Sequence, residues 1–300
     1  MQNNLLSNDP IDPRSAGPVP PYDSQESRQQ PGTQDQLITK ADHGEESYRG
    51  WGRLTGRIAL ITGGDSGIGR AVAIAYSREG ADVAINYLPE ESKDAEETAE
   101  WVKQAGRRVL HLPGDISQEA KCIDIIESVV REFGQIDILV NNAAFQMTHG
   151  EMDEWSSEEW EHTFRVNVHS IFYLCKAAMK HLKPGGVIIN TASIQSLRPK
   201  SQLLAYATSK GAVLNFTKAL AELAMKQGVR VNAVGPGPVW TPLIPSTMPE
   251  EKAQNFGSTT LFGRAAQPAE IAPAYVFLAS NEATYMTGEL LAITGGQTPL

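Results

Sequence analysis

Cysteine is scarce in this chain of 300 residues, where only Cys122 and Cys175 occur. Two cysteines cannot build a disulfide framework, and neither a CxxC pair nor a His/Cys cluster with the spacing of metal ligands is present. We therefore expect neither a disulfide-stapled fold nor a metal site. The same scarcity predicts a reduced, cytoplasmic protein.

Long apolar runs and an excess of positive charge are also missing. The longest apolar runs have the length of a strand, so no segment is expected to span a bilayer. The opening MQNNLLSNDP lacks the basic and apolar stretches of a secretory signal. With 26 Lys and Arg against 35 Asp and Glu, the formal net charge is -9. This acidic balance disfavours nucleic acid and membrane surfaces as main partners.

The first fifty residues lack apolar periodicity. They hold a third of the 18 prolines, together with many Gln, Ser and Asp residues. This composition predicts an extended or disordered N-terminal arm over residues 1–50, followed by a catalytic domain over residues 51–300. The arm is either a solvated tail or a segment that lies across a neighbouring subunit. Trp51 and Leu54 are the first expected anchors to the domain.

From Arg57 onward, short β-branched runs alternate with longer amphipathic stretches. Such alternation requires crossover connections and predicts a single α/β domain, a doubly wound parallel sheet of seven strands with helices on both faces. The expected strands are Ile58–Thr62, Val83–Asn86, Val109–Leu112, Ile136–Val140, Val187–Thr191, Val229–Val234 and Leu290–Ile293. The expected helices include Ile68–Glu79, Glu90–Gln104, Glu119–Phe133, Ser157–His181 and Tyr206–Lys226.

A glycine-rich turn, TGGDSGIG at residues 62–69, connects the first strand to the first helix. At this place in an α/β sheet, glycines let the backbone approach a pyrophosphate, and the start of the helix offers free N–H groups. The stretch GDSG also resembles the nucleophile segment of trypsin-like proteases. Those proteins are all-β, and the GxSxG pattern of a nucleophile elbow is not met, so we reject a hydrolase.

The spacing TGxxxGxG after the first strand resembles the short-chain dehydrogenase/reductase family, and the resemblance extends from about Leu54 to Gly296. The stretch NNAA at residues 141–144 is similar to the family's NNAG. The resemblance implies a Rossmann-type fold that binds NAD or NADP. It places Asp115 at the adenine, Pro236 and Gly237 near the nicotinamide, and Thr241 near the carboxamide. The expected cofactor-binding residues are Gly63, Asp65, Ser66, Gly67, Ile68, Gly69, Asn86, Asp115, Asn142, Ala143, Tyr206, Lys210, Pro236, Gly237 and Thr241.

Tyr206 and Lys210 lie four residues apart in a helical stretch and so share one face. A tyrosine with its ordinary pKa of about 10 exchanges protons poorly at neutral pH. A cation within about 4–6 Å lowers that pKa, and an oxidised nicotinamide would act in the same direction. We therefore expect Tyr206 to be the general acid–base and Lys210 to modulate its pKa. By resemblance, Lys210 also holds the cofactor ribose.

Two further catalytic residues are implied by the resemblance. Ser193, just past the fifth strand, matches the serine that hydrogen-bonds the substrate oxygen and stabilises developing charge. Asn167, inside a long helix, matches an asparagine that supports a proton relay through a water connected to the lysine. Asn167 could instead be a packing residue whose buried amide is satisfied.

The choice of nicotinamide cofactor depends on the end of the second strand. NAD-specific relatives carry an acid there, but this chain has NYLP at residues 86–89, and the next acid is Glu90. No basic residue for a 2′-phosphate is obvious, since Arg70 and Lys93 are not clearly in reach, and Asp65 would repel a phosphate if it pointed that way. An uncharged pocket does not exclude the phosphate, which gives a slight preference for NADP over NAD.

The segment Trp240–Phe262 matches the family's mobile lid over the substrate. Its apolar side chains indicate a small or medium, partly apolar aldehyde, ketone or alcohol, unless they pack the lid against its own domain or a neighbour. We expect reversible hydride transfer between NAD(P)(H) and a carbonyl/alcohol pair. The open alternatives are a sugar dehydrogenase, an acyl-carrier-linked ketoreductase and a non-catalytic NAD(P)-sensing regulator.

The arm, TGGDSGIGR and NYLPEE together resemble a bacterial branch with general-stress and aldehyde-reductase-like members. Family members are usually tetramers, so the resemblance implies a homotetramer.

Overall fold

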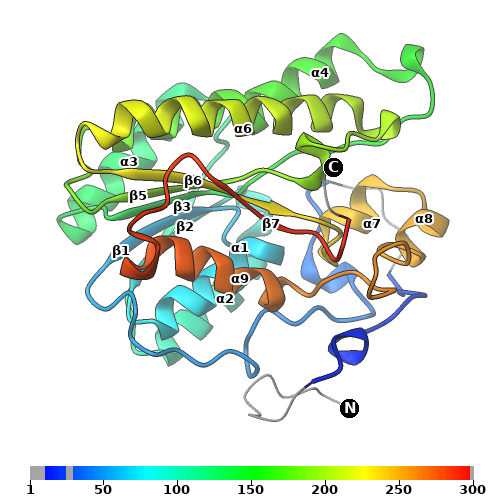
Figure 1. Cartoon of the computed structure of the whole chain (residues 1–300), viewed down its shortest axis with the longest axis horizontal. Helices are drawn as coiled ribbons and strands as arrows, with labels where there is room; N and C mark the ends of the chain where they lie inside the picture. The colour runs from blue at the N-terminus through cyan, green and yellow to red at the C-terminus, as the bar shows by residue number, and fades with distance from the viewer. Residues whose placement is uncertain (1–10, 25–29, 298–300) are drawn as a thin grey trace.

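The computed structural model describes residues 11–24 and 30–297 of the chain. They contain a parallel sheet of seven strands in the order β3-β2-β1-β4-β5-β6-β7, which confirms the predicted doubly wound fold (Figure 1). The order reverses between β1 and β4, where a crevice for a ligand is expected. The strands are β1 (Ile58–Thr62), β2 (Asp82–Tyr87), β3 (Val109–Pro113), β4 (Ile138–Asn141), β5 (Val187–Thr191), β6 (Arg230–Pro236) and β7 (Leu290–Ile293).

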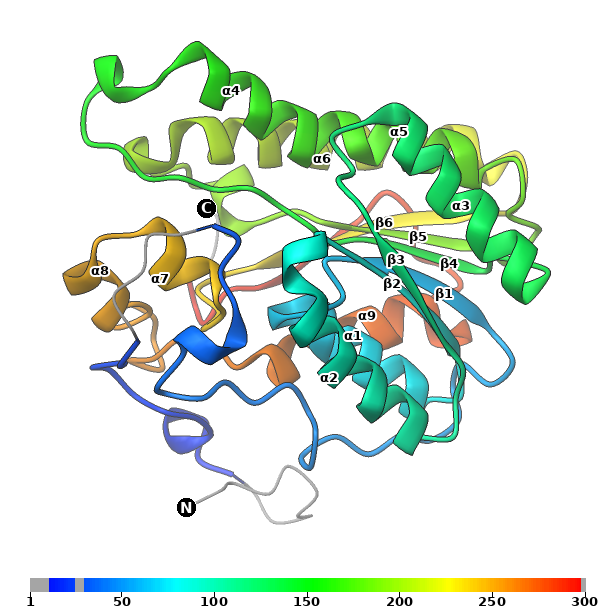
Figure 2. The same cartoon turned by 180° about the vertical axis from the view of Figure 1, so that it is seen from behind.

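Helices cover both faces of the sheet (Figure 2). One face carries α1 (Gly67–Arg78), α2 (Ser92–Gln104) and α9 (Pro268–Ala279). The other carries α3 (Glu119–Phe133), α4 (Ser157–Phe164), α5 (Ser170–Ala178) and α6 (Leu204–Met225). Two short helices, α7 (Leu243–Thr247) and α8 (Glu250–Gln254), follow β6. No helix among residues 11–24 and 30–297 is long and apolar enough to cross a membrane.

Strand β1 shows why nearly every position along a central strand carries an apolar side chain. Side chains alternate between the two faces of a strand, and here both faces are covered. Ala59 and Ile61 belong to the core under α1 and α9, whereas Ile58 and Leu60 belong to the core under α3 and α5. All five residues of β1 are buried. The run IALIT therefore has no position where a polar side chain would reach water.

The prediction of one continuous helix over Ser157–His181 is wrong. It consists of α4, a π-helical turn over Arg165–His169, and α5, which ends at Ala178. The turn surrounds Asn167, whose side chain hydrogen-bonds the backbone of Phe145 instead of facing water. Apolar periodicity does not reveal such a local widening, because it comes from a contact 22 residues away.

The described part of the predicted arm packs against its own chain. Tyr22 is fully buried and stacks on Trp240 with ring centroids 4.5 Å apart. Its hydroxyl accepts a hydrogen bond from the Ala265 N–H at 2.9 Å. Leu37 is buried in the same cluster, beside Trp240 and Ile244 of the lid segment. Tyr22 and Leu37 thus anchor the arm on the lid of its own chain, while the division into arm and domain stays a prediction.

The two anchors predicted after the arm behave differently. Leu54 is buried, as expected. Trp51 is 73% exposed, so that expectation is wrong. Its ring lies at the surface under the guanidinium of Arg49, whose carbon is 5.0 Å from the ring centroid.

Tyr22→Ala is expected to lower the free energy of unfolding by about 3–5 kcal/mol, because it removes a fully buried ring from the cluster with Trp240. Tyr22→Phe keeps the ring and is expected to cost only about 1–2 kcal/mol, for the Ala265 N–H left without its acceptor. Urea unfolding measures both. A loss below about 1 kcal/mol in Tyr22→Ala would contradict the packing of the arm.

Candidate active site

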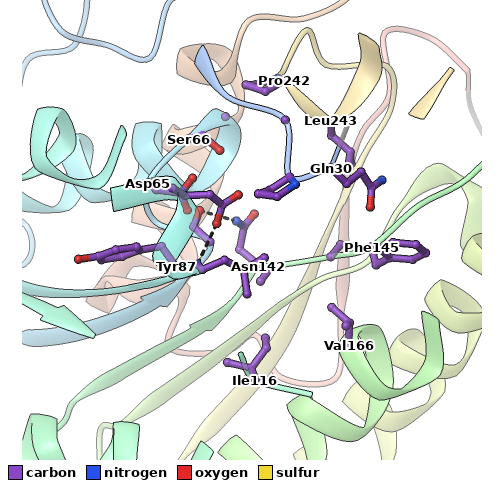
Figure 3. Close-up of a pocket in the computed structure, with 18 of the residues that line it drawn as sticks. Gln30, Asp65, Ser66, Tyr87, Ile116, Asn142, Phe145, Val166, Pro242 and Leu243 are labelled. Atoms are coloured by element: carbon purple, nitrogen blue, oxygen red, sulfur yellow. Dashed lines mark hydrogen bonds between the residues drawn. The ribbon is translucent and has the colours of Figure 1, made fainter. Parts of the chain in front are cut away.

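A cavity of about 490 Å³ opens at the carboxyl ends of the strands, beside the glycine-rich turn. Figure 3 shows Asp65, Ser66 and Asn142 around it, with Phe145, Val166 and Leu243 on the other side in that view. Most of the predicted cofactor-binding residues line the cavity: Gly63, Asp65, Ser66, Gly67, Ile68, Asn86, Asp115, Asn142, Ala143, Tyr206, Lys210 and Thr241. Gly69, Pro236 and Gly237 are not among its lining residues.

Gly69 and Gly237 serve the turns around the cavity. A Cβ on Gly69 would lie 1.7 Å from the carbonyl oxygen of Gly63, so only glycine lets α1 start this close to β1. A Cβ on Gly237 would lie 2.7 Å from the Cα of Thr294. These two glycines therefore shape the site by allowing close backbone approach.

The glycine-rich turn is fixed from the β4 side. The hydroxyl oxygen of Thr62 accepts hydrogen bonds from the N–H groups of Asn142 and Ala143, at 2.9 and 3.1 Å. The Asn142 amide in turn donates to the carbonyl oxygen of Thr62 at 3.1 Å. Helix α1 begins at Gly67, which lines the cavity, so the positive end of the helix dipole lies at the cavity wall.

Asn86 and Asp115, two of the predicted cofactor-binding residues, form hydrogen bonds within the chain. The Asn86 amide donates to the carbonyl oxygens of Leu112 and Gly114, both at 2.9 Å, and so ties β2 to the end of β3. The Asp115 carboxylate accepts from the N–H and the hydroxyl of Ser117. Both residues still line the cavity.

Two carboxyl groups line the cavity near the end of β2. Asp65 is 1% exposed, and its Oδ2 has no hydrogen-bond partner among the residues that the structure describes. Burial raises the pKa of Asp65 to about 6. Burial, followed by the negative charge of Asp65, raises the pKa of Glu91 to about 8.

Tyr206 and Lys210 lie on one face of α6 at the cavity wall, and Lys210 Nζ is 5.5 Å from the Tyr206 ring centroid. Lys210 is buried and donates a hydrogen bond to the carbonyl oxygen of Thr191 at 2.7 Å. Burial lowers its pKa to about 7. Burial also raises the pKa of Tyr206 to about 12, although a hydrogen bond with Ser193 acts against this.

The expected lowering of the Tyr206 pKa by Lys210 is therefore not produced by the chain alone. Both groups are withdrawn from water, and this desolvation disfavours the phenolate and the ammonium alike. The spacing of four residues correctly predicted that Tyr206 and Lys210 share one face of a helix. It carries no information on how far the two side chains are buried.

Ser193 and Asn167 stand behind the cavity wall and are not among its lining residues. Ser193 lies beyond the end of β5, is 7% exposed and hydrogen-bonds Tyr206. The Asn167 amide donates to the carbonyl oxygen of Phe145 and to the Ser209 hydroxyl, both at 2.9 Å, and accepts from the Phe145 N–H at 2.7 Å. These contacts match the alternative of a buried, satisfied amide, and they fix the loop after β4.

Several residues that line the cavity were not predicted from the sequence. They are Gln30, Pro31 and Gly32 of the arm, Glu91 of the turn before α2, Phe145, His162 and Val166 around α4, and Ser246 of α7. The lid had been expected to offer apolar side chains to the substrate. Leu243 does line the cavity, whereas Trp240 packs on Tyr22. For the arm, no local pattern could have indicated its place in the site.

Comparisons with known proteins agree with this geometry. A family model described as enoyl-(acyl carrier protein) reductase matches residues 63–298. The uncharacterized oxidoreductase YhdF of Bacillus subtilis is 46% identical over 288 residues, covering 96% of this chain and 98% of that protein. The chloroplastic NADPH-dependent aldehyde reductase 1 of Arabidopsis thaliana is 42% identical over 280 residues, covering 91% of this chain and 97% of that protein.

A solved structure shares the fold. It is a short-chain dehydrogenase from Burkholderia cenocepacia J2315 in complex with NADP, with a TM-score of 0.76 and 32% identity. The match covers 81% of this chain and 98% of that one. Together, these similarities show that the chain belongs to the short-chain dehydrogenase/reductase family of oxidoreductases.

Proposed function

We propose that this oxidoreductase transfers a hydride between NADP(H) and a carbonyl/alcohol pair, with a small or medium aldehyde or ketone as the substrate to be reduced. One observation carries the proposal. The cavity lined by the glycine-rich turn is also lined by Tyr206 and Lys210, so a dinucleotide on the turn and a proton donor meet in one space. The names of the Arabidopsis relative and the Burkholderia complex support NADP as the cofactor.

The residues present fit a dinucleotide. Gly63 and Gly67, with φ of 62° and 49°, turn the backbone toward the start of α1, where N–H groups suit a pyrophosphate. Asp65 lines the same cavity, and its carboxyl would be the acceptor there for a ribose hydroxyl. The cofactor supplies or takes up the hydride. The chain's own groups bind it, exclude water and handle the proton.

Tyr206 is the proposed proton donor. Its phenol is protonated at neutral pH, which is the form that reduction of a carbonyl requires. Because burial raises its pKa to about 12 in the chain alone, efficient proton transfer requires the bound cofactor and substrate to lower that pKa. Ser193, which hydrogen-bonds Tyr206, would hold the substrate oxygen beside the phenol. Lys210, fixed by Thr191, would hold the ribose. Asn167 would support the proton relay through a water connected to Lys210, and its side chain also fixes the loop after β4.

The substrate part of the cavity is mostly apolar. Phe145, Val166 and Leu243 line it together with His162, whose ring meets the Phe145 ring edge-on at 4.5 Å between centroids. Apolar walls with a few polar groups are typical of sites for small, partly apolar molecules. This lining supports an aldehyde or ketone more than a polyhydroxylated sugar.

A homotetramer and a cytoplasmic location are further proposals. The outer layer of α5 and α6 exposes Phe172 at 47%, Leu223 at 60% and Met225 at 44%. Exposed apolar side chains on long helices favour packing between subunits. The scarcity of cysteine supports a reducing compartment.

NADPH and NADH are titrated in parallel against the purified protein, followed by cofactor oxidation across a panel of aldehydes and ketones. We expect binding and turnover in the natural chain. Tyr206→Phe should bind the cofactor but lose turnover by at least about 100-fold, because the proton donor is gone. Tyr285→Phe, at a fully exposed tyrosine, is the matched control and should keep full activity. Turnover that survives in Tyr206→Phe would contradict the role of Tyr206.

Asp65 and Glu91 make the choice of cofactor depend on pH. Their raised pKa values of about 6 and about 8 leave both groups largely neutral at pH 5.5 and charged at about pH 9, where they repel a 2′-phosphate. The ratio of NADPH to NADH affinity should therefore fall as pH rises. Asp65→Asn should flatten this fall, whereas Asp124→Asn on the surface of α3 should not. Parallel titrations from pH 5.5 to 9 that give the same slope in all three proteins would exclude Asp65.

A further inference from the structure

The N-terminal segment forms one wall of the cavity. Gln30, Pro31 and Gly32 line it together with the glycine-rich turn, although they lie outside the residues matched by the family model. We propose that Gln30–Gly32 is a strap across the dinucleotide, which holds the cofactor on the glycine-rich turn and slows its release. This inference rests on the proposed function, since it requires a dinucleotide in the cavity.

The strap is in tight contact with the lid. A Cβ on Gly32 would lie 2.4 Å from the carbonyl oxygen of Pro242 and 2.8 Å from the hydroxyl oxygen of Ser246. No real side chain fits at these distances, so only glycine allows the strap backbone to lie this close to α7. Pro242 and Ser246 line the same cavity, and strap and lid thus form one continuous wall.

Hydrogen bonds hold the strap on its other sides. The Gln30 side-chain amide donates to the carbonyl oxygen of Gln146, in the loop after β4, at 2.7 Å. Two residues past Gly32, the Gln34 N–H donates to Asp94 Oδ2 of α2 at 2.8 Å. Figure 2 shows the N-terminal segment between α7 and α2, and Figure 3 shows Gln30 among the residues around the pocket. Residues 30–34 therefore connect the loop after β4, the lid and α2.

The contacts place the strap over the glycine-rich turn. Thr241, next to Pro242, lies against Gly67, since a Cβ there would be 3.1 Å from the Thr241 Cβ. On the α2 side, the Thr98 hydroxyl donates to the carbonyl oxygen of Asp65 at 2.9 Å. Gly32 thus contacts the lid and Gln34, just past the strap, contacts α2, and both of these elements touch the turn. A pyrophosphate bound at that turn would lie beneath the strap.

The strap is tethered by buried residues on both sides in the sequence. Tyr22 precedes the strap and Leu37 follows it. Both side chains are fully buried in the cluster with Trp240. The arm is thus anchored on its own chain both before and after the strap. None of its three residues carries an acid or a base, so its effect falls on cofactor binding and release and not on proton transfer.

Stopped-flow fluorescence tests the strap by following the release of bound NADPH into an excess of NADP⁺. Gln30→Ala, which removes the hydrogen bond to Gln146, should speed release about fivefold. Gly32→Ala, which forces the strap off Pro242, should speed it about tenfold. The KM for the cofactor should rise in both, while the single-turnover rate at saturating NADPH stays unchanged. Ile38→Ala, at an exposed position of the same arm, is the matched control and should release NADPH at the natural rate.

The outcomes separate the strap from the proposed function. A natural chain that binds neither NADPH nor NADH overturns the proposed function and the strap with it. Binding by the natural chain with equal release rates in Gln30→Ala, Gly32→Ala and Ile38→Ala overturns the strap alone. Thermal melts show whether each variant is folded, and if Gly32→Ala is not, Gln30→Ala decides the question.

Discussion

The hydrogen bond from Lys210 Nζ to the carbonyl oxygen of Thr191 joins the catalytic helix α6 to the end of β5. From Thr191 the connection continues, because its hydroxyl donates to Asn142 Oδ1 at 3.5 Å. Asn142 in turn bonds the backbone of Thr62, where the glycine-rich turn begins. These contacts connect Lys210 to the turn that would hold the cofactor. The site depends on this chain of contacts across the ends of three adjacent strands.

The features that could be predicted from the sequence are those fixed by local chemistry. Three strands have the bounds that apolar runs gave, namely Ile58–Thr62, Val187–Thr191 and Leu290–Ile293. The glycine-rich turn and the Tyr206–Lys210 pair were located because backbone geometry and helical spacing leave a signal within a few residues. The resemblance supplied Ser193 and Asn167, whose roles remain proposals. For Asn167 the side chain is fully engaged with Phe145 and Ser209.

The remaining features depend on contacts between distant parts of the chain. Tyr22 stacks on Trp240, and Gln30 bonds Gln146, 116 residues away. Nothing in the composition of a proline-rich segment distinguishes a solvated arm from one that closes a cavity. The pKa values were missed for the same reason: Tyr206, Lys210 and Asp65 are shifted mainly by burial, which is a property of the folded chain.

The central claim is that a hydride passes between NADPH and a carbonyl carbon in this cavity. Incubation of the protein with NADPH deuterated at both C4 positions and an accepted aldehyde tests it directly, with mass spectrometry and NMR of the alcohol. The account predicts one deuterium on the carbinol carbon in each molecule of product. An alcohol without deuterium, or oxidation of NADPH without an alcohol, would contradict it.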